Sequence, residues 1–321
     1  MKLKQILTGI ALASIPTISY AGTALNSAGA SFPASIYSRW FQDYSNASGN
    51  KVNYASVGSG AGIRQFVAGT VDFAASDEPI SSKDASKVKR GVVQIPMVGG
   101  TIAIAYNKAG CNLKLTQQQT VDVFLGKIND WKQLKCAPGK ITVAHRSDGS
   151  GTTFAFTNSL SAFGGWTPGV GKSVKWPVGV GGKGNEGVSG IIKNTTGSLG
   201  YVSYSFVKSQ NLQVAQLQNE SGKFVSPGTT SGSAALNEIT LDSNLAGENP
   251  NPTGARSYPI STLTWILAYK NGNGAKTDDI RGVLNYALSS KAQMIADDLG
   301  YVPLSGSVLN KARLAVIRIG K

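Results

Sequence analysis

Apolar side chains recur early in the chain with the spacing of one helix face. The positions are Ile36, Tyr37, Trp40, Phe41 and Tyr44. This period places them on a single side of a helix, and Pro33 suits its first turn because a proline there loses no hydrogen bond. A short apolar run at 23–25 comes before it. The pattern therefore predicts a strand, a turn over 26–33 and a helix.

The same order of strand, glycine-rich turn and helix is predicted again. Residues 51–57 favour a strand, 58–62 read Gly-Ser-Gly-Ala-Gly, and a helix opens at Ile63. A further strand is predicted at 71–76, and it delivers Asp77 to its carboxyl end.

A third unit follows in the middle of the chain. Residues 140–145 predict a strand, 146–151 a turn and 152–163 a helix. Strands that alternate with helices in this way indicate an α/β fold with parallel strands.

Each of the three turns carries a serine close to the helix start: Ser31, Ser59 and Ser150. A helix N-terminus presents unpaired N–H groups and a positive dipole, so each turn is a candidate anion site with a hydroxyl donor. The alternative is that each serine only caps its helix, which is the commonest use of serine there.

Arg146 favours the anion interpretation. Its planar guanidinium suits a tetrahedral oxyanion, and it lies four positions before Ser150. Asp148, between them, could hold the guanidinium in place. The alternative is an ordinary local ion pair of Arg146 with Asp148, which contributes little if exposed.

The chain begins with Lys2 and Lys4, then an apolar stretch over 6–18, then a small-residue step ending at Ala21. This is typical of a secretory signal peptide over 1–21. A transmembrane helix is the alternative, but the stretch is short and holds Pro16. We therefore expect an exported, soluble protein.

Export bears on the two cysteines, Cys111 and Cys136. An oxidising compartment makes one structural disulfide their expected use. A metal site would need further ligands, and His145 is the only histidine. We expect no metal and no cofactor.

The net charge is +14. Lys and Arg are spread thinly along the chain without a basic run, and the export signal also argues against nucleic acid as a partner. The charge could draw small anions or an anionic surface, or serve solubility alone.

Familiar catalytic and nucleotide motifs do not fit. Residues 165–173 nearly match a phosphate-binding P-loop, but the first glycine is displaced and Pro177 interrupts the following segment. Residues 179–184 match a dinucleotide fingerprint only weakly, and a glycine-rich turn before a helix at 187–193 is the simpler interpretation. With no G-x-S-x-G turn, a Ser-His-Asp hydrolase has little support. The chain is built to bind more than to catalyse.

Six stretches together resemble the periplasmic phosphate-binding proteins of phosphate ABC importers. They are SAGASFP, YASVGSGAGIRQF, VDFAASDEPIS, HRSDGSGTTFAFT, VKWPVGVGGKGNEG and GSLGYVSY. The resemblance covers nearly all of the chain after the signal. It implies these phosphate ligands: Ser31, Phe32, Ser59, Asp77, Arg146, Ser150, Gly151 and Thr152, with Asp148 supporting the arginine.

The chain departs from that family pattern at two positions. Ser31 stands where a threonine is common, which keeps the hydroxyl and the N–H. Glu78 stands where a small residue is expected, and its carboxylate would oppose an anion if it pointed inward. Because neighbouring residues at a strand end point in different directions, we expect Glu78 to face solvent.

The resemblance also implies a type II fold with two α/β lobes around a ligand cleft. We expect the first lobe over 22–105, the second over 106–258 and a return to the first over 259–321. The expected function is binding of inorganic phosphate by a periplasmic monomer and delivery to a membrane permease. A secreted phosphatase with Ser150 or Ser59 as nucleophile, and a receptor for sulfate or molybdate, are the alternatives.

Overall fold

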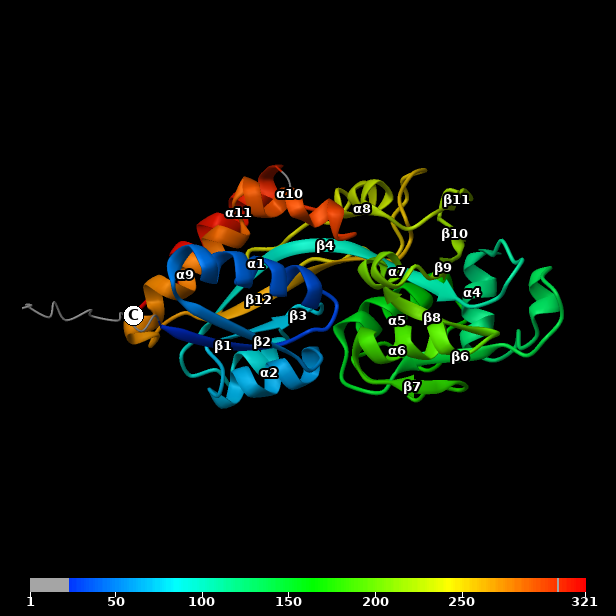
Figure 1. The fold of residues 1–321 in the computed structure, drawn as a ribbon, viewed down its shortest axis with the longest axis horizontal. Helices are drawn as coiled ribbons and strands as arrows, with labels where there is room; N and C mark the ends of the chain where they lie inside the picture. The colour runs from blue at the N-terminus through cyan, green and yellow to red at the C-terminus, as the bar shows by residue number, and fades with distance from the viewer. Residues whose placement is uncertain (1–22, 305) are drawn as a thin grey trace, which may run out of the picture.

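The computed structural model describes residues 23–304 and 306–321, which form two lobes side by side (Figure 1). The predicted signal peptide, 1–21, lies outside these residues. One path of paired strands runs through both lobes in the order β2-β1-β3-β12-β4-β8-β6-β7. The strands of this path are β1 (Ala24–Gly29), β2 (Lys51–Ser56), β3 (Phe73–Ser76), β4 (Val92–Tyr106), β6 (Thr142–Arg146), β7 (Val180–Gly182), β8 (Ser198–Ser203) and β12 (Ser261–Tyr269).

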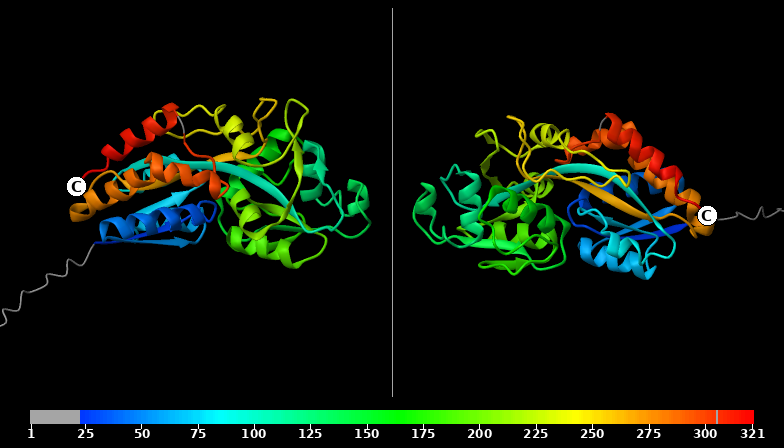
Figure 2. Two further views of the ribbon diagram at one scale, coloured as in Figure 1. Left: turned by 45° about the horizontal axis from the view of Figure 1, so that its top comes forward. Right: turned by 180° about the vertical axis from the view of Figure 1, so that it is seen from behind.

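Long strand β4 connects the two lobes (Figure 2). Its first part pairs with β12 as far as Thr101, and its last part, from Ile102, pairs with β8. β4 therefore changes partners between Thr101 and Ile102. The lobe boundaries at 105 and 258 stay a prediction.

Four short strands complete the sheets: β5 (Lys114–Leu115), β9 (Gln213–Val214), β10 (Gln216–Gln218) and β11 (Phe224–Val225). β9 pairs with β4, and the other three form a small sheet of their own.

Helices cover both faces of the sheet in each lobe (Figure 1). In the first lobe, α1, α9 and α11 lie on one face and α2 on the other. The helices are α1 (Ala34–Ser48), α2 (Ser59–Ala68), α3 (Ser82–Ala85), α4 (Gln117–Phe124), α5 (Gly151–Phe163), α6 (Gly184–Asn194), α7 (Tyr204–Gln210), α8 (Thr229–Leu236), α9 (Thr277–Ala287), α10 (Ser290–Asp298) and α11 (Gly306–Ile317), with short 3-10 turns η1 (Trp131–Leu134) and η2 (Gly274–Lys276).

The three predicted strand-turn-helix units are confirmed. They are β1-α1, β2-α2 and β6-α5, and the first strand extends to Gly29, beyond the predicted 23–25. The apolar face of α1 is buried as predicted, with Tyr37 and Trp40 fully enclosed. The helix predicted at 187–193 begins earlier, at Gly184. Within 23–304 and 306–321, no helix has the length and apolar character to cross a membrane.

The predicted disulfide between Cys111 and Cys136 is confirmed, with Cα atoms 5.4 Å apart. It joins the segment after β4 to the residues after η1 in the second lobe. There Trp131 is fully buried, and its Nε1 donates to the Gly197 carbonyl at 3.0 Å.

Replacing both cysteines by alanine should lower the free energy of unfolding by about 3 kcal/mol, because the disulfide restricts the unfolded chain. Urea unfolding of protein purified under oxidising conditions measures this loss. Reductant should produce the same loss in the wild type and none in the double variant. A double variant with the wild-type midpoint would contradict the prediction.

Candidate anion-binding site

The carboxyl ends of the parallel strands face the boundary between the lobes. Gly29 at the end of β1 lies opposite Ser56 of β2 and Ala75 of β3, and in the second lobe Arg146 of β6 lies opposite Gly182 of β7. Sites of open α/β sheets form at such strand ends, because the following helices begin there. The predicted site residues are brought together at this boundary.

Arg146 lies almost entirely out of solvent, with a side chain that is 1% exposed. Its Nε and one terminal nitrogen donate to the two oxygens of Asp148 at 2.7 and 2.6 Å. Burial favours a higher pKa for Asp148, but hydrogen bonds from Arg146, the charge of Arg146 and the Gly184 N–H hold that pKa below its ordinary value. Asp148 therefore fixes the guanidinium and stays ionised.

Asp77 is also buried, at 2% exposure. Its Oδ1 accepts a hydrogen bond from the Thr264 hydroxyl at 2.9 Å, and its Oδ2 accepts one from the Thr152 hydroxyl at 3.2 Å. Burial raises the pKa of Asp77 to about 7, although Thr264, Arg146 and Thr152 favour the ionised form. This carboxyl can accept a proton or a hydrogen bond near neutral pH.

Polar contacts join the two lobes around these charges. The Ser59 hydroxyl oxygen accepts from the Gly151 N–H at 3.1 Å and the Asp77 N–H at 3.3 Å. The Ser31 hydroxyl oxygen accepts from the N–H and the side-chain amide of Asn185, each at 2.9 Å. Residues of α2 and the first turn thus contact the N-termini of α5 and α6.

Two glycines permit this close approach. Gly58 has a φ of 86°, and a Cβ there would lie 2.2 Å from Oδ2 of Asp148. A Cβ at Gly151 would lie 2.6 Å from Oγ of Ser59 and 2.7 Å from the nitrogen of Asp77. Any larger residue would force the lobes apart, since real Cβ contacts are not this short.

The three serines have different local roles. Ser150 is the N-cap of α5, and its hydroxyl accepts from the Thr153 N–H at 3.0 Å, so the capping alternative holds for this residue. Gly58 and Pro33 occupy the N-cap positions of α2 and α1. The Ser59 and Ser31 hydroxyls instead accept from the Gly151 and Asn185 N–H groups of the second lobe.

Phe32 is fully buried, and its ring packs edge-on against Tyr301 with centroids 5.9 Å apart. Its carbonyl accepts from the Tyr301 hydroxyl at 2.7 Å. The side chain is therefore part of the core, and the backbone N–H is the group that Phe32 can offer to an anion.

The sequence analysis missed two buried residues of the site. Asn185 donates to Thr152 at 3.2 Å as well as to Ser31, and its carbonyl oxygen accepts from the Ser203 N–H at 2.8 Å. Thr264 of β12 holds Asp77. The stretch VKWPVGVGGKGNEG, which contains Asn185, was the available signal for that residue, whereas Thr264 lies in a mainly apolar strand that carried no signal.

The expectation that Glu78 faces solvent is wrong. Its side chain is 16% exposed and pairs with Lys172, which lies between α5 and β7. The prediction rested on the alternation of a strand, but β3 ends at Ser76. The Ser76 hydroxyl then donates to the Glu78 carbonyl at 2.6 Å, which turns the chain.

The site thus combines a fixed cation, a buried carboxyl and helix N-termini from both lobes. The buried Arg146 argues against a site for cations. The buried Asp77 distinguishes this site from one that binds anions through positive charge alone. Two lobes with such a site between them define a type II binding protein.

Comparisons with known proteins agree with this class. The PBP superfamily domain matches residues 17–291. The phosphate-binding protein PstS of Pasteurella multocida is 39% identical over 305 residues, covering 89% of this chain and 88% of the relative. PstS of Haemophilus influenzae is 40% identical over 307 residues, covering 89% and 90%. The chain belongs to the PstS family of phosphate-binding proteins.

Solved structures share the fold. The periplasmic phosphate-binding protein PfluDING superposes with a TM-score of 0.77 at 22% identity, covering 91% of this chain and 93% of that one. A phosphate-binding protein from Stenotrophomonas maltophilia gives 0.73 at 23% identity, covering 91% and 94%.

The raised pKa of Asp77 predicts a pH dependence of stability in phosphate-free buffer. Between the ordinary pKa of 3.8 and the folded value of about 7, the folded chain keeps a proton that the unfolded chain releases. Wild-type stability should therefore fall as pH rises through this window. Asp77→Asn removes the effect, so its stability relative to wild type should rise by at least about 1 kcal/mol from pH 4 to pH 7. Free energies of unfolding, measured with urea, that change with pH in the same way in the two proteins would contradict this.

Proposed function

We propose that this chain binds inorganic phosphate in the periplasm and delivers it to the membrane permease of an ABC importer, without catalysis. The observation that carries the proposal is the buried Asp77 carboxyl, which shares Thr152 with the buried Arg146 guanidinium. The Thr152 hydroxyl donates to Asp77, and Arg146 donates to that hydroxyl at 3.4 Å. The names of the PstS relatives support the same ligand.

A carboxylate beside an anion site selects among oxyanions. Phosphate near neutral pH keeps at least one proton, so it can donate a hydrogen bond to Asp77. Sulfate has no proton to donate, so it would leave this buried acceptor unpaired and face a like charge. Asp77 therefore favours phosphate over sulfate and molybdate.

The proposed ligand set has one acceptor for the phosphate proton and more donors than the four phosphate oxygens. Arg146 supplies charge, Asp77 accepts the proton, and the remaining donors are hydroxyls and N–H groups at helix starts. Besides those two, the proposed ligands are Ser31, Phe32, Ser59, Ser150, Gly151 and Thr152, with Asp148 supporting Arg146. Asn185 positions Ser31 and Thr152.

A phosphatase with Ser59 or Ser150 as nucleophile is less well supported. In the described part of the chain, the Ser59 and Ser150 hydroxyls accept hydrogen bonds from backbone N–H groups. A nucleophilic serine instead needs a general base to take its proton. The geometry favours binding of an intact anion.

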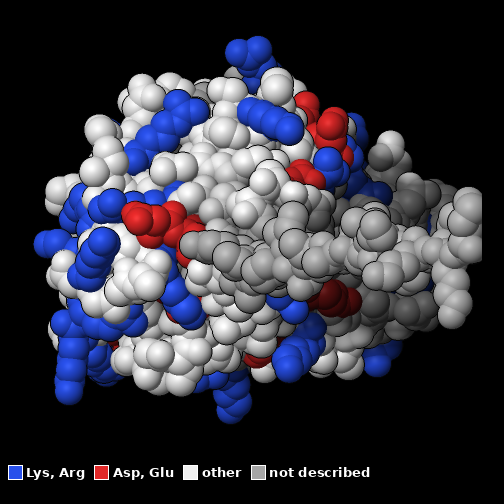
Figure 3. Space-filling view, turned by 60° about the vertical axis from the view of Figure 1, so that its left-hand side comes forward, with Lys and Arg blue, Asp and Glu red and all other residues white. Residues whose placement is uncertain are grey.

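The proposal also covers the lobe boundaries, the oligomeric state and the role of the surface charge. We place the lobes at 22–105 with 259–321 and at 106–258, and we take the chain to act as a monomer. Lysine and arginine side chains are scattered over the face in Figure 3 among uncharged and acidic residues. This distribution suits attraction of small anions better than binding of a nucleic acid, which needs a continuous basic surface.

Arg146→Ala should weaken phosphate binding by at least about 100-fold, because a charge-assisted contact is lost inside a dry site. Asp148→Asn should weaken binding less, because the guanidinium remains but is held more loosely. Isothermal titration calorimetry on ligand-stripped protein measures both. An unchanged dissociation constant for Arg146→Ala would place the anion site elsewhere.

The direct test of the proposed function compares wild type with Asp77→Asn in titrations with phosphate and with sulfate. The wild type should prefer phosphate by roughly 10⁴-fold, because the site requires a hydrogen bond from the ligand. The asparagine amide can donate a hydrogen bond to an oxyanion that carries no proton. The variant should therefore bind sulfate more tightly than wild type does, which reduces the preference for phosphate. Equal selectivity in the two proteins would refute this role of Asp77, and a wild type that binds no phosphate would refute the function.

A further inference from the structure

An ion pair joins the two lobes beside the anion site. Glu78 directly follows Asp77, and its Oε2 accepts from the Lys172 ammonium. The two side chains are 16% and 27% exposed, so solvent screens them only in part. This pair lies at the boundary between the lobes, one position after Asp77.

Both partners are tied to the site through their backbones. The Lys172 carbonyl accepts from the Ser150 N–H at 2.9 Å. The Glu78 N–H donates to the Ser76 hydroxyl at 3.1 Å, at the end of the strand that delivers Asp77. Attraction between the side chains therefore holds the Ser150 turn against the Asp77 strand end.

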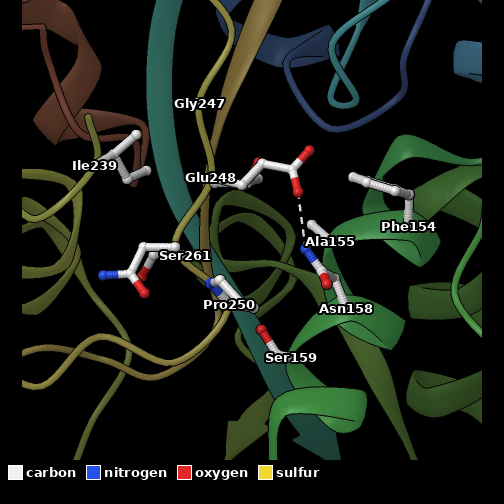
Figure 4. A pocket seen from close by; sticks show the side chains of 11 residues that line it. Phe154, Ala155, Asn158, Ser159, Ile239, Gly247, Glu248, Pro250 and Ser261 are labelled. Carbon is white, nitrogen blue, oxygen red and sulfur yellow. Dashed lines mark hydrogen bonds between the residues drawn. The ribbon is translucent and has the colours of Figure 1, made fainter. Parts of the chain in front are cut away.

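A second contact, within residues 106–258, lies close by. Asn158 of α5 donates to the Glu248 carboxylate at 2.8 Å, as the dashed line in Figure 4 shows. The loop of Glu248 is attached to β12 through Trp265, whose Nε1 donates to the Leu245 carbonyl at 2.8 Å.

Glu248 also lies near Glu78. Burial first, and the charge of Glu78 second, raise the pKa of Glu248 to about 7, although Asn158 lowers it. Glu78 and Glu248 therefore place two carboxylates in this region, whereas Asp84 of α3 has its own cation, Lys87, at 2.7 Å. Lys172 is the cation that pairs directly with Glu78.

We propose that Glu78 and Lys172 form a clasp that sets the lifetime of the anion-bound, closed protein. Lys172 has a second role, because it neutralises a carboxylate that would otherwise repel the anion held beside Asp77. This inference rests on the proposed function and adds two affinity-determining residues to it.

The two roles predict unequal effects of the two substitutions. Glu78→Ala removes the attraction between the lobes and also removes the repulsive charge. Lys172→Ala removes the attraction and leaves Glu78 unpaired next to the anion. Lys172→Ala should therefore weaken phosphate binding more than Glu78→Ala, and the double variant should resemble Glu78→Ala.

The experiment measures release of radiolabelled phosphate chased by unlabelled phosphate, together with equilibrium binding. Glu78→Ala should release phosphate about 5-fold faster than wild type, as expected for one partly buried ion pair. Lys172→Ala should bind roughly 20-fold more weakly, and adding Glu78→Ala to it should restore part of that loss. Salt should speed release from wild type more than from Glu78→Ala.

Lys276→Ala is the matched control. Lys276 pairs with Asp72 at 2.8 Å, and both residues lie in the first lobe, so this pair does not cross the boundary between the lobes. Its release rate should equal that of the wild type. A wild type that retains phosphate, with all Glu78 and Lys172 variants releasing it at the wild-type rate, would overturn the clasp alone. A wild type that retains no phosphate would overturn the proposed function and the clasp together.

Discussion

The structure depends on the compensation of buried charge at the boundary between the lobes. The Arg146 guanidinium is almost completely buried, and Asp148 neutralises it from within the same turn. Asp77 is buried across the boundary, where the hydroxyls of Thr152 and Thr264 donate to its oxygens. A charge in such a place is tolerated only when its partners are fixed. Asp148 satisfies Arg146 locally, whereas Asp77 depends on Thr152 from the second lobe.

This constraint explains why the lobes meet as they do. Glycines at 58 and 151 allow the backbone of one lobe to reach the polar groups of the other. Ser59, Asn185 and Thr152 then distribute hydrogen bonds across the boundary. The lobes meet through polar contacts, which water can replace when they separate. Such a contact suits a protein that must both hold and release a ligand.

The sequence predicted those parts of the site that lie within one strand-turn-helix unit. Ser59, Asp77 and Arg146 were placed correctly at strand ends because hydrophobic periodicity and glycine-rich turns are local signals. Asn185 and Thr264 were missed because their importance arises only when distant segments meet. Glu78 was placed wrongly because the strand ends at Ser76 and the chain turns there, and its partner Lys172 lies 94 positions away. The partner change within β4 is likewise a property of the sheet, because apolar residues continue along the strand on both sides of the change.

A crystal structure of the wild-type chain grown with phosphate tests the central claim most directly. The account predicts phosphate at the boundary of the lobes, with Arg146 donating to its oxygens and an Asp77 carboxylate oxygen about 2.6 Å from a protonated phosphate oxygen. Glu78 should remain paired with Lys172 outside the ligand's own contacts. Phosphate bound elsewhere, or bound here with Asp77 turned away from it, would contradict the account.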